Sequence, residues 1–207
     1  MSVKVKICGL TNLADAAAAT AAGADLLGFI FAAASPRRVT VATVAELARQ
    51  LPAHVVRVGV FVNPSEDQVR QAISECGLDL LQFHGEETPE FCTQFGLMSV
   101  KAFRVRDERS LPALVDYPTD AWLLDTYAEK QLGGTGQTFN WELAVAAKDL
   151  GRGKPIFLAG GLTSENVAAA VRRVRPFAVD VSSGVEISPG RKDHSKVAAF
   201  IQAAKSA

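Results

Sequence analysis

The chain of 207 residues carries 22 Lys and Arg against 22 Asp and Glu, and 48% of its residues are hydrophobic. Balanced charge excludes a net electrostatic attraction to nucleic acid or to an anionic membrane, and no apolar run approaches the roughly 18 residues of a membrane span. We therefore expect a chain with no nucleic-acid or membrane partner and with enough length to bury a sizeable core.

The first residues and the cysteines indicate the compartment. The start, "MSVKVKICG", enters a strand pattern at once, without an apolar leader after a basic region, so a cytoplasmic location is the expectation. The three cysteines, Cys8, Cys76 and Cys92, are odd in number and form no C-x-x-C pair, which argues against a disulfide framework and a structural zinc site. We expect free thiols, with Cys76 and Cys92 as small packing residues.

Short β-branched or aromatic runs alternate with helical patterns along the chain, which indicates βα units and a parallel sheet. The predicted strands span residues 3–7, 26–31, 55–61, 78–83, 98–103, 121–125, 155–159 and 178–182. The predicted helices span residues 12–22, 41–51, 65–76, 88–95, 108–116, 141–149, 164–174 and 193–205. The helix over 108–116 is the weakest of these, because Pro112 interrupts it.

Eight such units closing on themselves predict an α/β fold of the (β/α)8 TIM-barrel type. Internal similarity between "GADLLGF" at 23–29 and "GLDLLQF" at 77–83 supports a repeated unit. The alternative is an open, doubly wound sheet, which the same alternation permits. No linker or change of composition divides the chain, so residues 1–207 are predicted to form a single domain.

In a barrel every strand delivers its last residue to the same rim, and two such residues could exchange protons with a substrate. Cys8 follows the first strand, and a cysteine whose pKa is lowered by nearby cations can act as a base or nucleophile. Asp125 ends the apolar run "WLL", and an aspartate kept protonated by its surroundings can act as an acid. From the residues alone, a packing role is favoured for Cys8, because a buried cysteine at a strand end is often a packing residue.

The segments after the last two strands predict a phosphate site. Gly160 and Gly161 precede a helix start, and Ser182, Ser183 and Gly184 follow the neighbouring strand, so backbone N–H groups and hydroxyls surround helix N-termini there. Barrels commonly hold phosphate at these loops, although the glycines could merely allow tight turns. The segment "GGTGQTF" at 133–139 is predicted to be a mobile loop over the site.

Three further polar residues stand near strand ends. Arg37, in the loop "SPRR", offers a planar fork to a carboxylate or phosphate, or is simply a solvated charge. His84 ends the fourth strand and could face the substrate or be a satisfied structural histidine. Asp180 lies within the eighth strand.

Taken together, these motifs resemble the phosphoribosylanthranilate isomerase family of tryptophan biosynthesis, from residue 3 to the last helix. The matching pieces are "KICGLT", "GFIF" with "SPR", "VGVFVN", "QFHGEE", "LLDT", "GGTGQTFNW", "LAGGLTSENV", "RPFAVDVSSGVE" and "PGRKDH". The resemblance implies a barrel enzyme, an aldose–ketose isomerase (intramolecular oxidoreductase). Its reaction is the Amadori rearrangement of N-(5-phosphoribosyl)anthranilate to 1-(2-carboxyphenylamino)-1-deoxy-D-ribulose 5-phosphate, with no metal and no organic cofactor.

The resemblance also implies a role for each candidate residue. Asp125 would be the acid that protonates the ribose ring oxygen, and Cys8 the base that removes the proton from C2. Arg37 would lie near the anthranilate carboxylate, with His84 facing the substrate and Asp180 near its hydroxyls or amine. The phosphate would bind to Gly160, Gly161, Ser182, Ser183 and Gly184.

Two other functions remain open at this point. A different reaction on a related sugar-phosphate barrel is one, but an epimerase needs metal-ligand clusters that the three histidines do not form, and a synthase is expected to have a lysine at a strand end. A non-catalytic phosphate-binding barrel is the other, and it would need neither Cys8 nor Asp125. The partner expected in every case is a phosphorylated small molecule, bound by a monomer or a homodimer.

Overall fold

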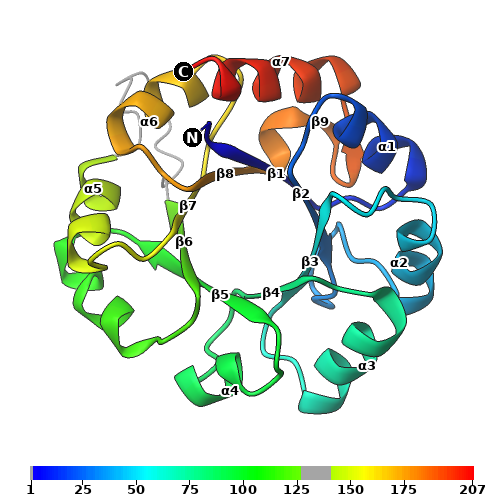
Figure 1. The fold of residues 1–207 in the computed structure, drawn as a ribbon, viewed down its shortest axis with the longest axis horizontal. Helices are drawn as coiled ribbons and strands as arrows, with labels where there is room; N and C mark the ends of the chain where they lie inside the picture. Colours follow the sequence, from blue (N-terminus) through cyan, green and yellow to red (C-terminus); the bar gives the residue numbers. More distant parts are fainter. Residues whose placement is uncertain (1, 127–140) are drawn as a thin grey trace.

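The computed structural model, which describes residues 2–126 and 141–207, is a ring of strands surrounded by helices (Figure 1). The strands follow one another in chain order and close into a barrel, because β1 pairs in parallel with β8. The closed ring confirms the predicted (β/α)8 barrel over the open sheet, which would leave two edge strands unpaired. The strands are β1 (Lys4–Cys8), β2 (Leu26–Ile30), β3 (Val56–Phe61), β4 (Leu80–Phe83), β5 (Met98–Val105), β6 (Ala121–Thr126), β7 (Ile156–Ala159) and β8 (Ala178–Val181).

The helices cover the outside of the ring, one after nearly every strand. They are α1 (Leu13–Ala21), α2 (Val41–Ala48), α3 (Glu66–Cys76), α4 (Pro89–Thr93), α5 (Trp141–Leu150), α6 (Val167–Val174) and α7 (His194–Lys205). Over the described ranges, none of them combines the length and the apolar character needed to cross a membrane. The segment 133–139, predicted as a mobile loop, lies outside the described residues.

The prediction of a helix over 108–116 was wrong. Two short 3-10 helices stand there instead, η1 (Glu108–Ser110) and η2 (Pro112–Asp116). Pro112 has no N–H to continue a helix from the preceding turn, so the chain restarts as a second turn at that residue.

The core has two layers because successive strand residues point to opposite faces of the sheet. The outer layer lies between strands and helices and includes Val5, Ile7, Leu27 and Phe29. The inner layer fills the barrel with mostly aliphatic side chains and one aromatic ring: Cys8, Leu26, Val58, Val60, Leu80, Val100, Ala102, Ala121, Leu123, Phe157, Ala159 and Ala178. This alternation decides which strand residues can reach a site inside the barrel.

The repeated motif seen in the sequence has a structural role at the start of the strands. Asp25 accepts a hydrogen bond from the Val5 amide at 3.0 Å, and Asp79 accepts one from the Arg57 amide at 2.9 Å. In each case an aspartate that directly precedes one strand accepts a hydrogen bond from the backbone of the previous strand in the chain. The repeat therefore stabilises the face of the barrel opposite to the strand C-termini.

One element was not predicted. Between β8 and α7 the chain forms a 3-10 turn, η3 (Ser183–Val185), and a small antiparallel hairpin of β9 (Glu186–Ser188) and β10 (Arg191–Lys192). The hairpin carries Glu186 and Lys192, both buried, to the rim of the barrel.

Candidate active site

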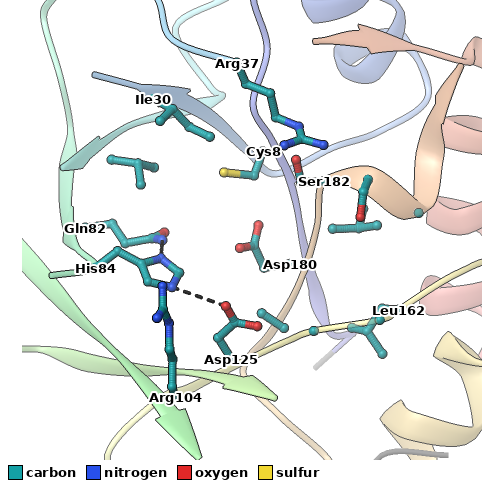
Figure 2. A pocket seen from close by; sticks show the side chains of 17 residues that line it. Cys8, Ile30, Arg37, Gln82, His84, Arg104, Asp125, Leu162, Asp180 and Ser182 are labelled. Carbon is teal, nitrogen blue, oxygen red and sulfur yellow. Dashed lines mark hydrogen bonds and ion pairs between the residues drawn. The ribbon is translucent and has the colours of Figure 1, made fainter. Parts of the chain in front are cut away.

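The C-terminal ends of the strands surround a cavity of about 640 Å³ (Figure 2). Every site residue predicted from the sequence lines this one cavity: Cys8, Arg37, His84, Asp125, Gly160, Gly161, Asp180, Ser182, Ser183 and Gly184. They come from six different strand ends and their loops, which only the closed barrel brings together. Cys8 and Asp125 point into the cavity from different sides, with Asp180 between them in the view.

The first side of the cavity, which we call the β1–β8 wall, consists of Cys8 and Asp180, with Lys6 buried behind them. Lys6 and Asp180 are register partners on the paired strands, and Lys6 Nζ donates to Asp180 Oδ1 at 2.9 Å. The Lys6 side chain is completely buried and Cys8 is 5% exposed. Burial raises the pKa of Cys8, while the neighbouring Lys6 ammonium opposes that rise.

Gly28 on β2 makes room for these side chains. It pairs with Cys8 across the β1–β2 ladder, and a Cβ added at this glycine would lie 2.8 Å from Cys8 Sγ and 3.0 Å from Lys6 Nζ. Any larger residue would therefore displace the thiol or the ammonium group.

The second side, which we call the β4–β6 wall, consists of Gln82, His84, Arg104 and Asp125. His84 Nε2 lies 3.3 Å from Asp125 Oδ2, and Gln82 Nε2 lies 3.3 Å from His84 Nδ1. With the Gln82 amide donating to Nδ1, His84 carries a proton on Nε2 and donates it toward Asp125. The histidine thus orients one carboxylate oxygen and leaves the other toward the cavity.

Arg37 is held by the hairpin. Its Nε and Nη2 donate to the two carboxylate oxygens of Glu186 at 2.8 and 2.6 Å, and Lys192 Nζ donates to the same carboxylate at 2.8 Å. Burial would raise the pKa of Glu186, but these two cations outweigh burial and lower it to about 2. The pair fixes the guanidinium beside the cavity.

The loops after β7 and β8 form a glycine-lined corner of the cavity. Gly160 and Gly161 have φ values of 88° and 64°, in the left-handed region that favours glycine. A Cβ on Gly184 would lie 2.1 Å from the Leu162 carbonyl oxygen, so the two loops are packed against each other. Ser182 Oγ is buried and has no hydrogen-bond partner among the described residues. This corner therefore offers a polar atom that a ligand can satisfy.

Four charged residues near the cavity were not singled out from the sequence: Lys6, Arg104, Glu186 and Lys192. The alternation in "VKVKIC" places Lys6 on the same side of the strand as Cys8, and Arg104 lies on β5 in the inward register of Ala102. That signal could have identified both. Glu186 and Lys192 lie in a short hairpin without periodicity, so no pattern of this kind marks them.

Metal-ligand geometry is absent from the described part of the chain. No three His, Cys, Asp or Glu side chains group there in a way that could hold an ion. All three cysteines are free and buried, in agreement with the expectation of free thiols.

The fold and the cavity define a (β/α)8-barrel protein with a site at the C-terminal ends of its strands. In this site an aspartate and a cysteine point into the cavity from different sides, next to a glycine-lined corner. The model of the family described as "N-(5'phosphoribosyl)anthranilate (PRA) isomerase" matches residues 5–203. The chain belongs to this family.

Individual members of the family are similar in sequence to this chain along nearly its whole length. The N-(5'-phosphoribosyl)anthranilate isomerase of Geobacter sp. (strain M21) is 54% identical over 202 residues, which is 98% of each chain. That of Pelobacter propionicus is 51% identical over 203 residues, covering 98% of this chain and 96% of the relative. The crystal structure of the Thermotoga maritima isomerase superposes with a TM-score of 0.92 at 42% identity, over 99% of this chain and 100% of that one.

One solved relative contains a ligand. It is a phosphoribosyl anthranilate isomerase in complex with reduced 1-(o-carboxyphenylamino)-1-deoxyribulose 5-phosphate. It superposes with a TM-score of 0.89 at 40% identity and covers 99% of this chain and 100% of its own.

Proposed function

We propose that this chain catalyses the Amadori rearrangement of N-(5-phosphoribosyl)anthranilate to 1-(2-carboxyphenylamino)-1-deoxy-D-ribulose 5-phosphate, a step of tryptophan biosynthesis. Family membership over residues 5–203 and the ligand of the solved relative support this reaction. The observation that carries the proposal is that Cys8 and Asp125 point into one cavity from different sides. A proton donor and a proton acceptor so placed can act on neighbouring atoms of one substrate.

Asp125 is the proposed acid and acts first. It protonates the ring oxygen of the phosphoribosyl group, the bond from that oxygen to C1 breaks, and the anthranilate nitrogen forms a protonated imine with C1. The hydrogen bond between His84 and Asp125 supports this role, because it fixes one carboxylate oxygen and leaves the other for the substrate.

Cys8 is the proposed base and acts second. Its thiolate removes the proton from C2, which gives an enolamine, and tautomerisation of the enolamine gives the C2 ketone. The reaction consumes no net proton, since Asp125 gives one and Cys8 takes one. The Lys6 ammonium beside Cys8 supports a thiolate in this position.

The remaining residues bind the substrate in this proposal. Glu186 occupies Nε and Nη2 of Arg37, which leaves the Nη1 side of the guanidinium for the anthranilate carboxylate. Asp180 faces the hydroxyls or amine, and His84 faces the sugar. The phosphate binds in the corner of Gly160, Gly161, Ser182, Ser183 and Gly184, where the unpartnered Ser182 hydroxyl supports an anion site.

Two other properties are part of the proposal. We propose a cytoplasmic location, supported by three free thiols, since thiols persist in reducing compartments. We also propose that residues 1–207 act as a single domain, supported by the pairing of β1 with β8 from opposite ends of the chain. Assembly as a monomer or a homodimer stays a prediction.

The test is turnover of freshly prepared N-(5-phosphoribosyl)anthranilate by protein purified from a host without its own isomerase, with chromatographic detection of the ketose product. We expect product from the native chain and almost none from Cys8→Ala. Binding of the carboxyphenylamino sugar phosphate without any turnover would favour a non-catalytic barrel instead. No turnover, but conversion of another phosphorylated sugar, would favour a different barrel enzyme.

A further inference from the structure

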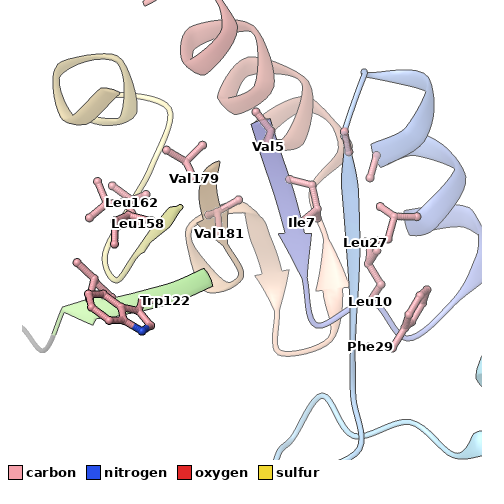
Figure 3. Close-up of a cluster of buried hydrophobic side chains, with 14 of the residues drawn as sticks. Val5, Ile7, Leu10, Leu27, Phe29, Trp122, Leu158, Leu162, Val179 and Val181 are labelled. Atoms are coloured by element: carbon pink, nitrogen blue, oxygen red, sulfur yellow. The ribbon is translucent and has the colours of Figure 1, made fainter. Parts of the chain in front are cut away.

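Lys6 is a buried cation that gives or takes no proton in the acid–base mechanism above. It lies on β1 between Val5 and Ile7, which point to the surrounding helices (Figure 3). The Lys6 side chain therefore points into the barrel, where it is 0% exposed. A lysine is almost never completely buried unless its charge is matched by a partner.

Two partners surround the Lys6 ammonium. Nζ donates to Asp180 Oδ1 at 2.9 Å, and Cys8, the next inward residue on β1, interacts with the ammonium group electrostatically. Gly28 leaves room for both side chains because it has no Cβ. A Cβ at this position would lie 2.8 Å from Cys8 Sγ and 3.0 Å from Lys6 Nζ. The geometry therefore places one ammonium group between a carboxylate and a thiol.

The charges around Cys8 favour a negative thiol. The groups that interact with it are Lys6 on the same strand, Asp180 on β8, Lys192 on β10 and Arg37 from the loop after β2. Glu186 on β9 pairs with both Arg37 and Lys192. Within this cluster of described residues, three cations face two carboxylates, so a Cys8 thiolate balances the charge that is left over.

We propose that Lys6 is a positioning residue for the reaction: its ammonium group stabilises the thiolate form of Cys8 against the effect of burial and directs the sulfur to the cavity. This inference rests on the proposed function, in which Cys8 is the base. Lys6 itself does not touch the substrate, because it lies one inward position deeper in the barrel than Cys8.

The pKa shifts of Lys6 and Cys8 show how burial and charge compete at this pair. Burial alone lowers the pKa of Lys6, but Asp180 and Cys8 outweigh burial and raise it. Burial outweighs the cations around Cys8 and raises the pKa of its thiol, and Lys6 is the largest influence that limits this rise. Removing the ammonium therefore leaves burial and Asp180 to act on the thiol together.

The experiment measures the Cys8 thiolate directly. The native chain and Lys6→Met are alkylated with iodoacetamide across a pH series, and the label on Cys8 is quantified by peptide mass spectrometry. We expect the Cys8 profile of Lys6→Met to move to higher pH by about 1 to 3 pH units, because an opposite charge within about 4 to 6 Å has an effect of that size. At a fixed pH below both midpoints, labelling falls about 10- to 1000-fold.

The matched control is Lys4→Met. Lys4 lies on the same strand and pairs with Asp25, but it lies about 13 Å before Cys8 along that strand. It removes the same charge from β1 without touching the thiol, so we expect the native Cys8 profile. A shift as large as that of Lys6→Met would mean that the net charge of β1, and not the proximity of Lys6, determines the pKa of the Cys8 thiol.

A double-mutant cycle separates the effect on Cys8 from a merely structural role of Lys6. If Lys6 serves only to neutralise Asp180, then Lys6→Met has no effect on the Cys8 profile in an Asp180→Asn background. Our proposal predicts a shift to higher pH in both backgrounds. An effect that disappears with Asp180 would overturn it.

Gly28→Ala tests the contact without removing a charge and serves if Lys6→Met does not fold. The added Cβ forces Cys8 Sγ and Lys6 Nζ apart, so the Cys8 profile again moves to higher pH. An unchanged profile in a folded Gly28→Ala or Lys6→Met protein contradicts the proposal. If the native chain turns over the substrate but the Cys8 alkylation profile of Lys6→Met is unchanged, only the role of Lys6 is contradicted. If that profile shifts but the native chain shows no turnover, only the proposed function is contradicted.

Discussion

The two walls of the cavity differ in how far water reaches their ionisable groups. On the β1–β8 wall the side chains of Lys6 and Asp180 are 0% and 10% exposed, whereas on the β4–β6 wall those of His84 and Asp125 are 22% and 35% exposed. A dry wall must match each charge with a partner, because an unpaired buried charge is costly. A wetter wall needs only to orient its carboxylate, which one 3.3 Å hydrogen bond does.

The largest effect tests whether the two walls form one acid–base pair. Cys8→Ala and Asp125→Asn should each lower kcat/KM by about 10² to 10⁴, the usual value of a positioned acid or base. The double variant should lose much less than the product of both effects, since the residues act as a unit. Steady-state kinetics on the folded variants measures this.

The matched control for the cysteine is Cys76→Ala, which removes a buried thiol outside the cavity. It should retain native kcat/KM. Full activity in either Cys8→Ala or Asp125→Asn would remove that residue from the mechanism.

The second effect is a pH dependence that originates on the dry wall. Burial raises the pKa of Cys8 above its ordinary value, so the thiolate fraction falls as the pH falls below that pKa. We expect kcat/KM to decline about tenfold per pH unit on the acid side, provided that proton removal from C2 limits the rate. A profile that stays flat well below the midpoint measured by Cys8 alkylation would contradict the role of base.

The sequence predicted the residues at the rim of both walls better than the residue that lies below the rim. Asp125 and His84 stand at strand ends, where the barrel pattern places them on the rim, and Cys8 and Asp180 follow the same rule. Lys6 was missed even though the alternation in "VKVKIC" contains it, because it lies below the rim. Its partner, 174 positions away, is given only by the pairing of β1 with β8.

The hairpin could not be predicted for a different physical reason. Its strands are too short to show a period, and Glu186 is a core partner of Arg37 from 149 positions away. The barrel itself could be predicted, because each strand and helix repeats a local pattern. The prediction of a helix over 108–116 was the exception. Pro112 interrupts the local pattern there, and two 3-10 helices form in place of one α-helix.

The third effect tests whether the charges around Arg37 depend on the hairpin. Glu186→Gln leaves the buried Lys192 without its carboxylate, so the free energy of unfolding at pH 7 should fall on the order of 3 kcal/mol. KM should rise about tenfold with less change in kcat, since Arg37 loses its orientation but the acid and base remain. Urea unfolding and steady-state kinetics give the two numbers.

Acid pH sharpens this test. The pKa of Glu186 is lowered to about 2, against about 4.3 for an unfolded glutamate, so its stabilisation is present above pH 4.3 and is lost as the pH falls toward 2. The difference in stability between the native chain and Glu186→Gln should shrink over that interval. Glu142→Gln, which breaks the exposed pair with Arg173, is the control and should change stability little at any pH.

The smallest effect lies on the wetter wall. His84→Ala removes the hydrogen bond that orients Asp125, and a neutral hydrogen bond of about 0.5 to 1.5 kcal/mol corresponds to a loss of about 2- to 10-fold in kcat/KM. His84→Gln, whose amide can still donate, should recover part of that loss. If His84→Ala instead loses as much kcat/KM as Asp125→Asn, the histidine acts on the substrate itself. The contrast between a β1–β8 wall of paired charges and a β4–β6 wall that only orients its carboxylate then does not hold.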